Sequence, residues 1–112
     1  MSCVGSHESF RVEFTPIDRL EVAFTKEHGK VTTFSIQYQA VIRGDWISVV
    51  RYDTNHGYLH RHRFWLASDQ QIDDREPRNQ PAAEYTVPFK TAYDELCADW
   101  RAFRANLKRK RP

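Results

Sequence analysis

The sequence predicts an α+β fold: an antiparallel β-meander of about five strands, with one C-terminal amphipathic helix packed on the sheet. Two observations indicate this fold. Apolar and polar residues alternate through the first half of the chain, whereas apolar residues recur at spacings of three and four near its end. With 112 residues, the chain is expected to form a single domain over 1–112.

Five segments are expected to be strands. Turn signals separate them: Thr15–Asp18, His28-Gly29, Gly44-Asp45 and Thr54–Gly57. The strands are expected over residues 10–14, 20–24, 31–42, 46–53 and 58–66.

The second half of the chain changes character. Residues 67–87 lack periodicity and are expected to form a long loop with room for one short helical turn. So long a loop is uncommon in a compact domain unless it is mobile or functional. From Phe89 to Leu107 an aromatic-rich apolar stripe predicts the helix, with Pro88 in its first turn. Residues 1–8 are expected to be flexible and residues 108–112 to form a basic tail.

Composition narrows the class of protein. Hydrophobic residues make up 40% and charged residues 29%, as in a globular domain. No apolar run approaches the roughly 18 residues of a membrane span, and the N-terminus does not resemble a signal peptide. The short apolar runs also lead us to expect no membrane partner. The two cysteines, Cys3 and Cys97, cannot form a disulfide framework, so we expect a cytoplasmic protein.

The net charge of +2 is too small to indicate a polyanionic partner, but the position of the charges along the chain does indicate one. No acidic residue follows Asp99, and the cations that do follow are Arg101, Arg104, Lys108, Arg109, Lys110 and Arg111. Such a tail favours nucleic acid, although cations also stabilise a helix C-terminus by themselves.

The segment from Arg51 to Arg63 is rich in residues that carry chemistry. A four-residue loop over Thr54–Gly57 would place Asp53 opposite Tyr58 and Arg51 opposite His60. One face of this hairpin would then gather five side chains, because directly opposite residues share a face. They are Arg51, Asp53, Tyr58, His60 and His62.

This face has the groups that a metal-independent endoribonuclease needs. His60 and His62 would be the acid–base pair, Arg51 the phosphate ligand and Asp53 the residue that orients an imidazole. Additional nucleic-acid contacts are expected from Tyr58, Arg61, Arg63, Lys108, Arg109, Lys110 and Arg111. No cofactor is expected.

Two alternatives use the same residues. His60 and His62 would provide two metal ligands, and His56 or Asp53 would be the third. Alternatively, the segment is an ordinary polar-faced strand, with His60 bonded to a backbone or carboxylate group and Arg51 paired with Asp53.

The stretch from Val49 to Asp53, followed by His56, His60 and His62, resembles small uncharacterised prokaryotic proteins near the TumE-type toxin components of toxin–antitoxin systems. The resemblance covers roughly residues 45–65. It implies a small α+β protein that acts on RNA and is neutralised by an antitoxin protein.

The sequence thus predicts an RNA-directed protein of toxin type. The alternative is a non-enzymatic module that binds a protein or nucleic acid through the aromatic helix and the basic tail. A homodimer is a further expectation, since an exposed sheet edge can pair between chains.

Overall fold

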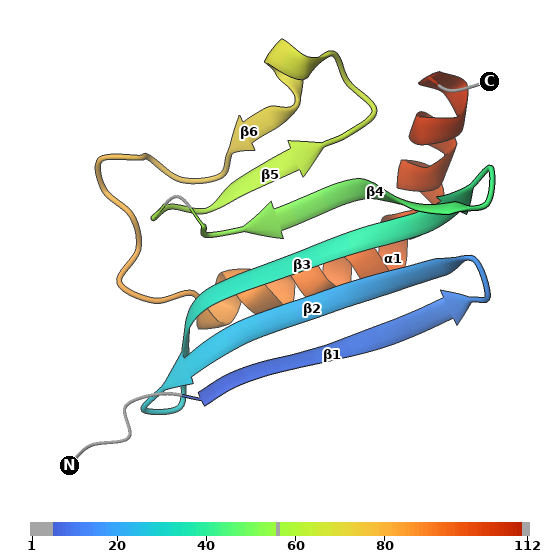
Figure 1. The fold of residues 1–112 in the computed structure, drawn as a ribbon. Helices are drawn as coiled ribbons and strands as arrows, with labels where there is room; N and C mark the ends of the chain where they lie inside the picture. Colours follow the sequence, from blue (N-terminus) through green and yellow to red (C-terminus); the bar gives the residue numbers. More distant parts are fainter. Residues whose placement is uncertain (1–5, 56, 111–112) are drawn as a thin grey trace.

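A computed structural model, which describes residues 6–55 and 57–110, confirms the α+β class. Six antiparallel strands lie in chain order in one sheet, and one α-helix follows them (Figure 1). The strands are β1 (Ser6–Thr15), β2 (Asp18–Glu27), β3 (Lys30–Ile42), β4 (Asp45–Asp53), β5 (His60–Arg63) and β6 (Ile72–Asp74). A 3-10 helix spans Ser68–Gln70 and the α-helix, α1, spans Thr86–Lys110.

The helix covers one face of the sheet and leaves the other face open (Figure 1). The alternating residues Phe34, Ile36, Tyr38 and Ala40 of β3 are buried, because strand side chains alternate between faces and these point toward α1. We call the two sides of the sheet the helix face and the open face.

Aromatic rings fasten α1 to the sheet. Trp100 stacks on Phe14 with ring centroids 5.0 Å apart and meets Tyr38 edge-on at 5.8 Å. Phe89 lies 4.9 Å from Phe24. The wide aromatic stripe predicted from the sequence is therefore the core-facing side of the helix.

A buried polar network crosses the same interface. Asp18, which is 1% exposed, accepts hydrogen bonds from the Tyr38 hydroxyl at 2.5 Å and the Thr15 hydroxyl at 2.6 Å. The Arg104 guanidinium of α1 lies 3.4 Å from the same carboxylate. Burial, together with the hydrogen bond to Asp18, raises the pKa of Tyr38, so its hydroxyl remains a donor.

The predicted long loop over 67–87 is wrong in part, because it contains strand β6; the 3-10 helix agrees with the short helical turn that the prediction allowed. Strand β6 pairs with β5, which places Asp73 opposite Arg61, and the two side chains form an ion pair at 2.8 Å. The short Ile-Asp-Asp sequence of β6 has no strand-like alternation, so pairing with β5 defines it rather than local propensity.

One side chain, Glu76, organises the rest of this segment. It accepts hydrogen bonds from the Leu59 N–H at 2.6 Å, the Ala82 N–H at 2.9 Å and the Tyr85 hydroxyl at 2.5 Å. Burial alone would raise the pKa of Glu76, but these hydrogen bonds outweigh it and lower the pKa. Glu76 thus ties the segment before α1 to the start of β5.

The two ends of the described chain are more regular than the sequence suggested. Strand β1 already begins at Ser6, inside the segment expected to be flexible, and α1 continues into the predicted basic tail as far as Lys110. None of the helices within residues 6–55 and 57–110 has the length and apolar character needed to cross a lipid bilayer.

Candidate functional site

The β4–β5 hairpin has a longer connection than predicted. Asp53 lies opposite His60 and Arg51 opposite His62, so the connection is the six residues 54–59 and the predicted register is wrong by two residues. An even shift preserves which side chains share a face. Arg51, Asp53, His60 and His62 therefore still lie together on the open face, as the sequence predicted.

Asp53 is the centre of this cluster. Its carboxylate accepts hydrogen bonds from Arg51 Nε at 2.7 Å and the Asn55 N–H at 3.1 Å, and His60 Nε2 lies 3.0 Å away. Asp53 and His60 are each only 1% exposed. A buried carboxylate with three donors is well satisfied, and such an arrangement stabilises the folded state.

His62 is fixed by hydrogen bonds at both ring nitrogens. The Gln71 amide donates to the Leu66 carbonyl at 3.0 Å, which leaves its Oε1 to accept from His62 Nε2 at 2.6 Å. Arg51 Nη2 then donates to His62 Nδ1 at 3.3 Å. We assign the neutral Nε2–H tautomer to His62 from this network.

These contacts bear on the predicted acid–base pair. His60 is enclosed, with its ring centroid 5.4 Å from that of Tyr58, and His62 is stacked on Phe64 at 3.9 Å. Neither imidazole presents a free nitrogen to a substrate in this arrangement. The geometry is that of a polar network that holds β4, β5 and the segment after β5 together.

The structure does not support the alternative prediction that the histidines bind a metal ion. In the described ranges no group of three or more His, Cys, Asp or Glu side chains is arranged to hold a metal ion. His56, one of the three predicted ligands, lies outside the described residues.

Three of the predicted nucleic-acid contacts are engaged within the protein. Arg61 lies on the helix face in its ion pair with Asp73, and Arg63 donates to the Gln70 carbonyl at 3.0 Å. Tyr58 is 8% exposed. These side chains hold β5, β6 and the neighbouring loops together.

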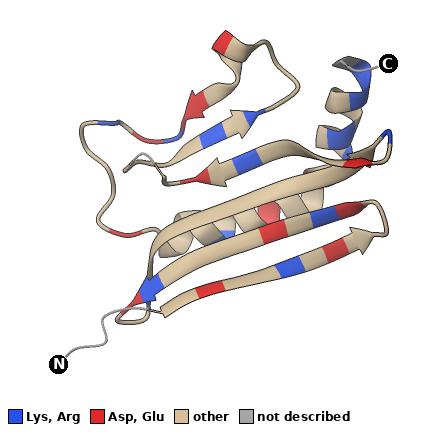
Figure 2. Ribbon diagram, viewed as in Figure 1, with Lys and Arg blue, Asp and Glu red and all other residues tan. Residues whose placement is uncertain are grey.

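The remaining predicted contacts lie at the end of α1. Lys108 and Arg109 are exposed, as is Arg101, whereas Arg104 is occupied by Asp18. The side chain of Lys110 and the whole of Arg111 lie outside the described residues. Figure 2 shows the last turns of α1 with cations and without acidic residues.

A hollow of about 390 Å³ adjoins this basic end, and we call it the Trp65 hollow. Trp65 forms part of its wall, and its ring packs against Phe103 of α1 with centroids 5.7 Å apart. The residues that line it are Trp65, Leu66, Ala67, Gln70, Asn106 and Arg109. Residues that carry an indole, two side-chain amides and a guanidinium thus line one hollow.

Sequence reasoning missed Trp65, Gln70 and Asn106 as site residues. Trp65 is at the end of a predicted strand, and Gln70 is in a predicted loop, so nothing local indicated that either lies beside the helix end. The basic tail was the available signal, because it marked one side of the hollow.

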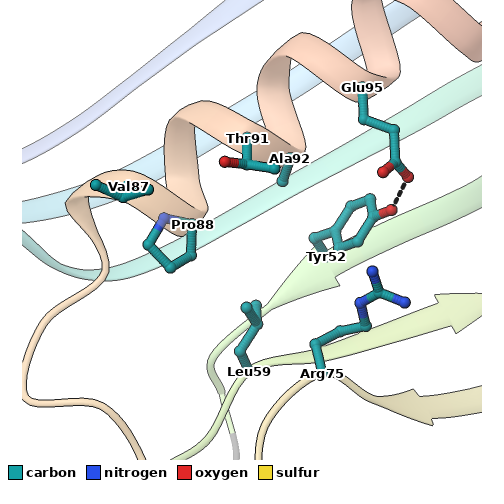
Figure 3. A pocket seen from close by; sticks show the side chains of 8 residues that line it. All are labelled: Tyr52, Leu59, Arg75, Val87, Pro88, Thr91, Ala92 and Glu95. Carbon is teal, nitrogen blue, oxygen red and sulfur yellow. Dashed lines mark hydrogen bonds between the residues drawn. The ribbon is translucent and has the colours of Figure 1, made fainter.

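A second pocket, of about 270 Å³, lies on the helix face between the start of α1 and β4–β6 (Figure 3). Its wall is largely apolar, with Leu59, Val87, Pro88 and Ala92. The Tyr52 hydroxyl donates to the Glu95 carboxylate here. Burial and this hydrogen bond raise the pKa of Tyr52 to about 12, so Tyr52 remains neutral and cannot act as a base near neutral pH.

The comparisons with known proteins identify a family whose function is unknown. Neither the curated proteins nor the solved structures contain a match to this chain. One family model, described as Domain of unknown function (DUF7718), matches residues 5–112. That match spans nearly the whole sequence, including all of the strands and the helix described above. The chain therefore belongs to the DUF7718 family.

Proposed function

We propose that this protein is an RNA-directed binding module that holds single-stranded RNA at the C-terminal part of α1. The observation that carries the proposal is the Trp65 hollow, which opens beside a helix end with cations and no acidic residues. Stacking platforms next to cationic side chains are the usual means by which proteins bind single strands.

Each side chain around the hollow suits one part of a nucleotide. The Trp65 indole can stack on an unstacked base, and the Gln70 amide can donate and accept hydrogen bonds at a base edge. The Asn106 Oδ1 accepts from Arg109 Nη2, so the Asn106 amide has its N–H groups left to donate. Arg109 has the forked donor geometry that matches phosphate oxygens, and Lys108 adds a point charge. A volume of about 390 Å³ lies within the ordinary range for ligand pockets.

The contacts of the histidines favour binding over cleavage. A ribonuclease that uses His60 and His62 would need both imidazoles at the substrate, but His60 is 1% exposed and both ring nitrogens of His62 are engaged. We therefore assign these residues, with Arg51 and Asp53, to the stability of the hairpin.

The experiment is a titration of fluorescent single-stranded RNA with the wild-type protein and with three variants. Trp65→Leu keeps apolar packing on Phe103 but removes the stacking face, and Arg109→Gln removes the phosphate fork. Trp65→Leu is expected to weaken binding about tenfold, since stacking contributes roughly 1–3 kcal/mol per base. Arg109→Gln is expected to weaken it by a similar factor, since a hydrogen bond to a charged group contributes about 1.5–3 kcal/mol.

Lys90→Gln is the matched control. Lys90 is a cation at the other end of the same helix, with 77% of its side chain exposed, and its loss should leave binding nearly unchanged. Equal loss in Lys90→Gln and Arg109→Gln would contradict the proposed site.

The same mixtures test for catalysis on a denaturing gel. We expect intact RNA throughout. Cleavage that disappears in His62→Ala but persists in Arg109→Gln would contradict a pure binding role and support the endoribonuclease alternative.

A further inference from the structure

The two edges of the sheet differ in a way that bears on assembly. At one edge β6 has three residues, and short edge strands resist pairing with other chains. At the other edge β1 has ten residues, and within residues 6–55 and 57–110 no element lies beyond it in the sheet (Figure 1). Its outer row of backbone N–H and C=O groups is therefore open to another strand.

We propose that β1 pairs with β1 of a second copy of this chain, antiparallel and centred on Val12, to give a twofold dimer with one continuous sheet. This inference does not depend on the proposed RNA binding. It rests on the exposure of β1 and on the match of its side chains with themselves.

Strand geometry restricts the possible registers. In an antiparallel pair, two residues that lie opposite each other either both direct their backbone groups at the partner or both direct them away. Along one strand these two kinds of residue alternate. In a twofold pair of identical strands, like therefore meets like only when the twofold axis passes through a residue, which then lies opposite its own counterpart. The candidate centres within the middle of β1 are therefore Phe10, Arg11, Val12 and Glu13.

Charge eliminates two of these centres, because like charges directly opposite each other are destabilising. A register centred on Arg11 places two guanidinium groups opposite each other, and one centred on Glu13 does the same with two carboxylates. A register centred on Phe10 places the charged Glu8 opposite the apolar Val12.

The register centred on Val12 matches both faces. On the open face Arg11 lies opposite the second copy's Glu13, and Glu13 opposite its Arg11. On the helix face Phe10 lies opposite Phe14, twice, because the pairing is symmetric. Because β1 shifts register against β2 between Glu13 and Thr15, regular ladder hydrogen bonds are expected only among residues 11–13, and the Phe10–Phe14 contacts would be made by side chains.

The exposure of these side chains agrees with this pairing. Phe10 is 43% exposed, although its ring lies 6.2 Å from that of Tyr93, so a large apolar surface remains for a partner. The Arg11 side chain is 48% exposed in its ion pair with Glu21. Glu13 is exposed and has no ion-pair partner among the described residues, which leaves its carboxylate for the second copy's Arg11.

The first test is sedimentation of charge variants. The wild-type protein should sediment at twice the 13.3 kDa chain mass. Arg11→Glu makes both open-face positions acidic and Glu13→Lys makes both basic, so each variant alone should be a monomer. An equimolar mixture should give a heterodimer, because each acidic position then meets a basic one.

Glu8→Lys is the control, since position 8 would lie opposite Pro16, beyond the end of β1. It should sediment as the wild type does. A wild-type monomer, dimers of either single variant, or a mixture that stays monomeric would each overturn the proposal.

The second test reads the register directly, in a background with Cys3 and Cys97 replaced by serine. Val12→Cys places two thiols opposite each other at a separation compatible with a disulfide. Mild oxidation should link Val12→Cys chains and leave Arg11→Cys chains unlinked. The reverse result would overturn the Val12-centred register even if the protein is a dimer.

Discussion

Replacement of Asp53 by alanine would remove the centre of the polar network on the β4–β5 hairpin. Three donors lose their acceptor: Arg51 Nε, His60 Nε2 and the Asn55 N–H. Arg51 retains 31% exposure of its side chain and can bind water, but the His60 side chain is 2% exposed and cannot. A buried donor that loses its acceptor costs about 1–3 kcal/mol, so we expect a loss of at least that size in the free energy of unfolding.

Urea unfolding followed by circular dichroism measures this loss, provided that the slope with denaturant stays constant. Asp74→Ala is the matched control, because the Asp74–Arg78 pair is exposed and should contribute about 0–1 kcal/mol. A loss below about 1 kcal/mol for Asp53→Ala would refute the structural role. Asp53 and its partners would then again be candidates for catalysis.

Three further predictions concern other parts of the fold and the site. Because the pKa of Glu76 is lowered in the folded state, its contribution to stability is present above the ordinary glutamate pKa of 4.5 and is lost as pH falls through the folded value. Urea titrations below pH 5 should therefore show a smaller acid-induced loss in Glu76→Gln than in the wild type, and equal losses would contradict the assignment. Tyr38→Phe removes a donor to the buried Asp18 carboxylate and should cost about 1.5–3 kcal/mol of unfolding free energy, whereas no measurable cost would show that the hydroxyl is dispensable. In RNA titrations over a range of salt, joint replacement of Lys108 and Arg109 by glutamine should reduce the slope of log K against log salt by about 1.4, and an unchanged slope would exclude phosphate contacts by these residues.

The sequence predicts the meander and the helix well, because their signals are local. Alternation along β3 and the aromatic stripe from Phe89 to Leu107 each arise from burial of one side of one element. The short β6 has no such signal. Its existence depends on pairing with β5 and on the ion pair between Arg61 and Asp73.

The hairpin shows where local reasoning stops. The turn closes where the sequence indicates, since the Gly57 N–H donates to the Thr54 carbonyl at 3.0 Å. Pairing with β4 nevertheless resumes only at His60, because the Leu59 N–H bonds Glu76 and the Leu59 carbonyl accepts from the Arg75 N–H at 3.0 Å. A contact with residues far along the chain thus determines the register.

In the candidate site, too, some features follow from local sequence patterns and others depend on contacts between distant parts of the chain. The shared face of Arg51, Asp53, His60 and His62 follows from strand periodicity, so the sequence predicts it. The burial of His60 and the double engagement of His62 depend on Tyr58 and Gln71, whose positions are set by loops. Trp65 joins the end of α1 only through tertiary packing on Phe103.

The central proposal places RNA at the Trp65 hollow and leaves the histidine cluster as a structural element. NMR titration of the isotope-labelled protein with single-stranded RNA tests this most directly. We expect the largest shifts at the Trp65 indole, at the side-chain amides of Gln70 and Asn106 and at Arg109. Shifts centred instead on Arg51 and His62, with the Trp65 hollow unaffected, would contradict the proposed site.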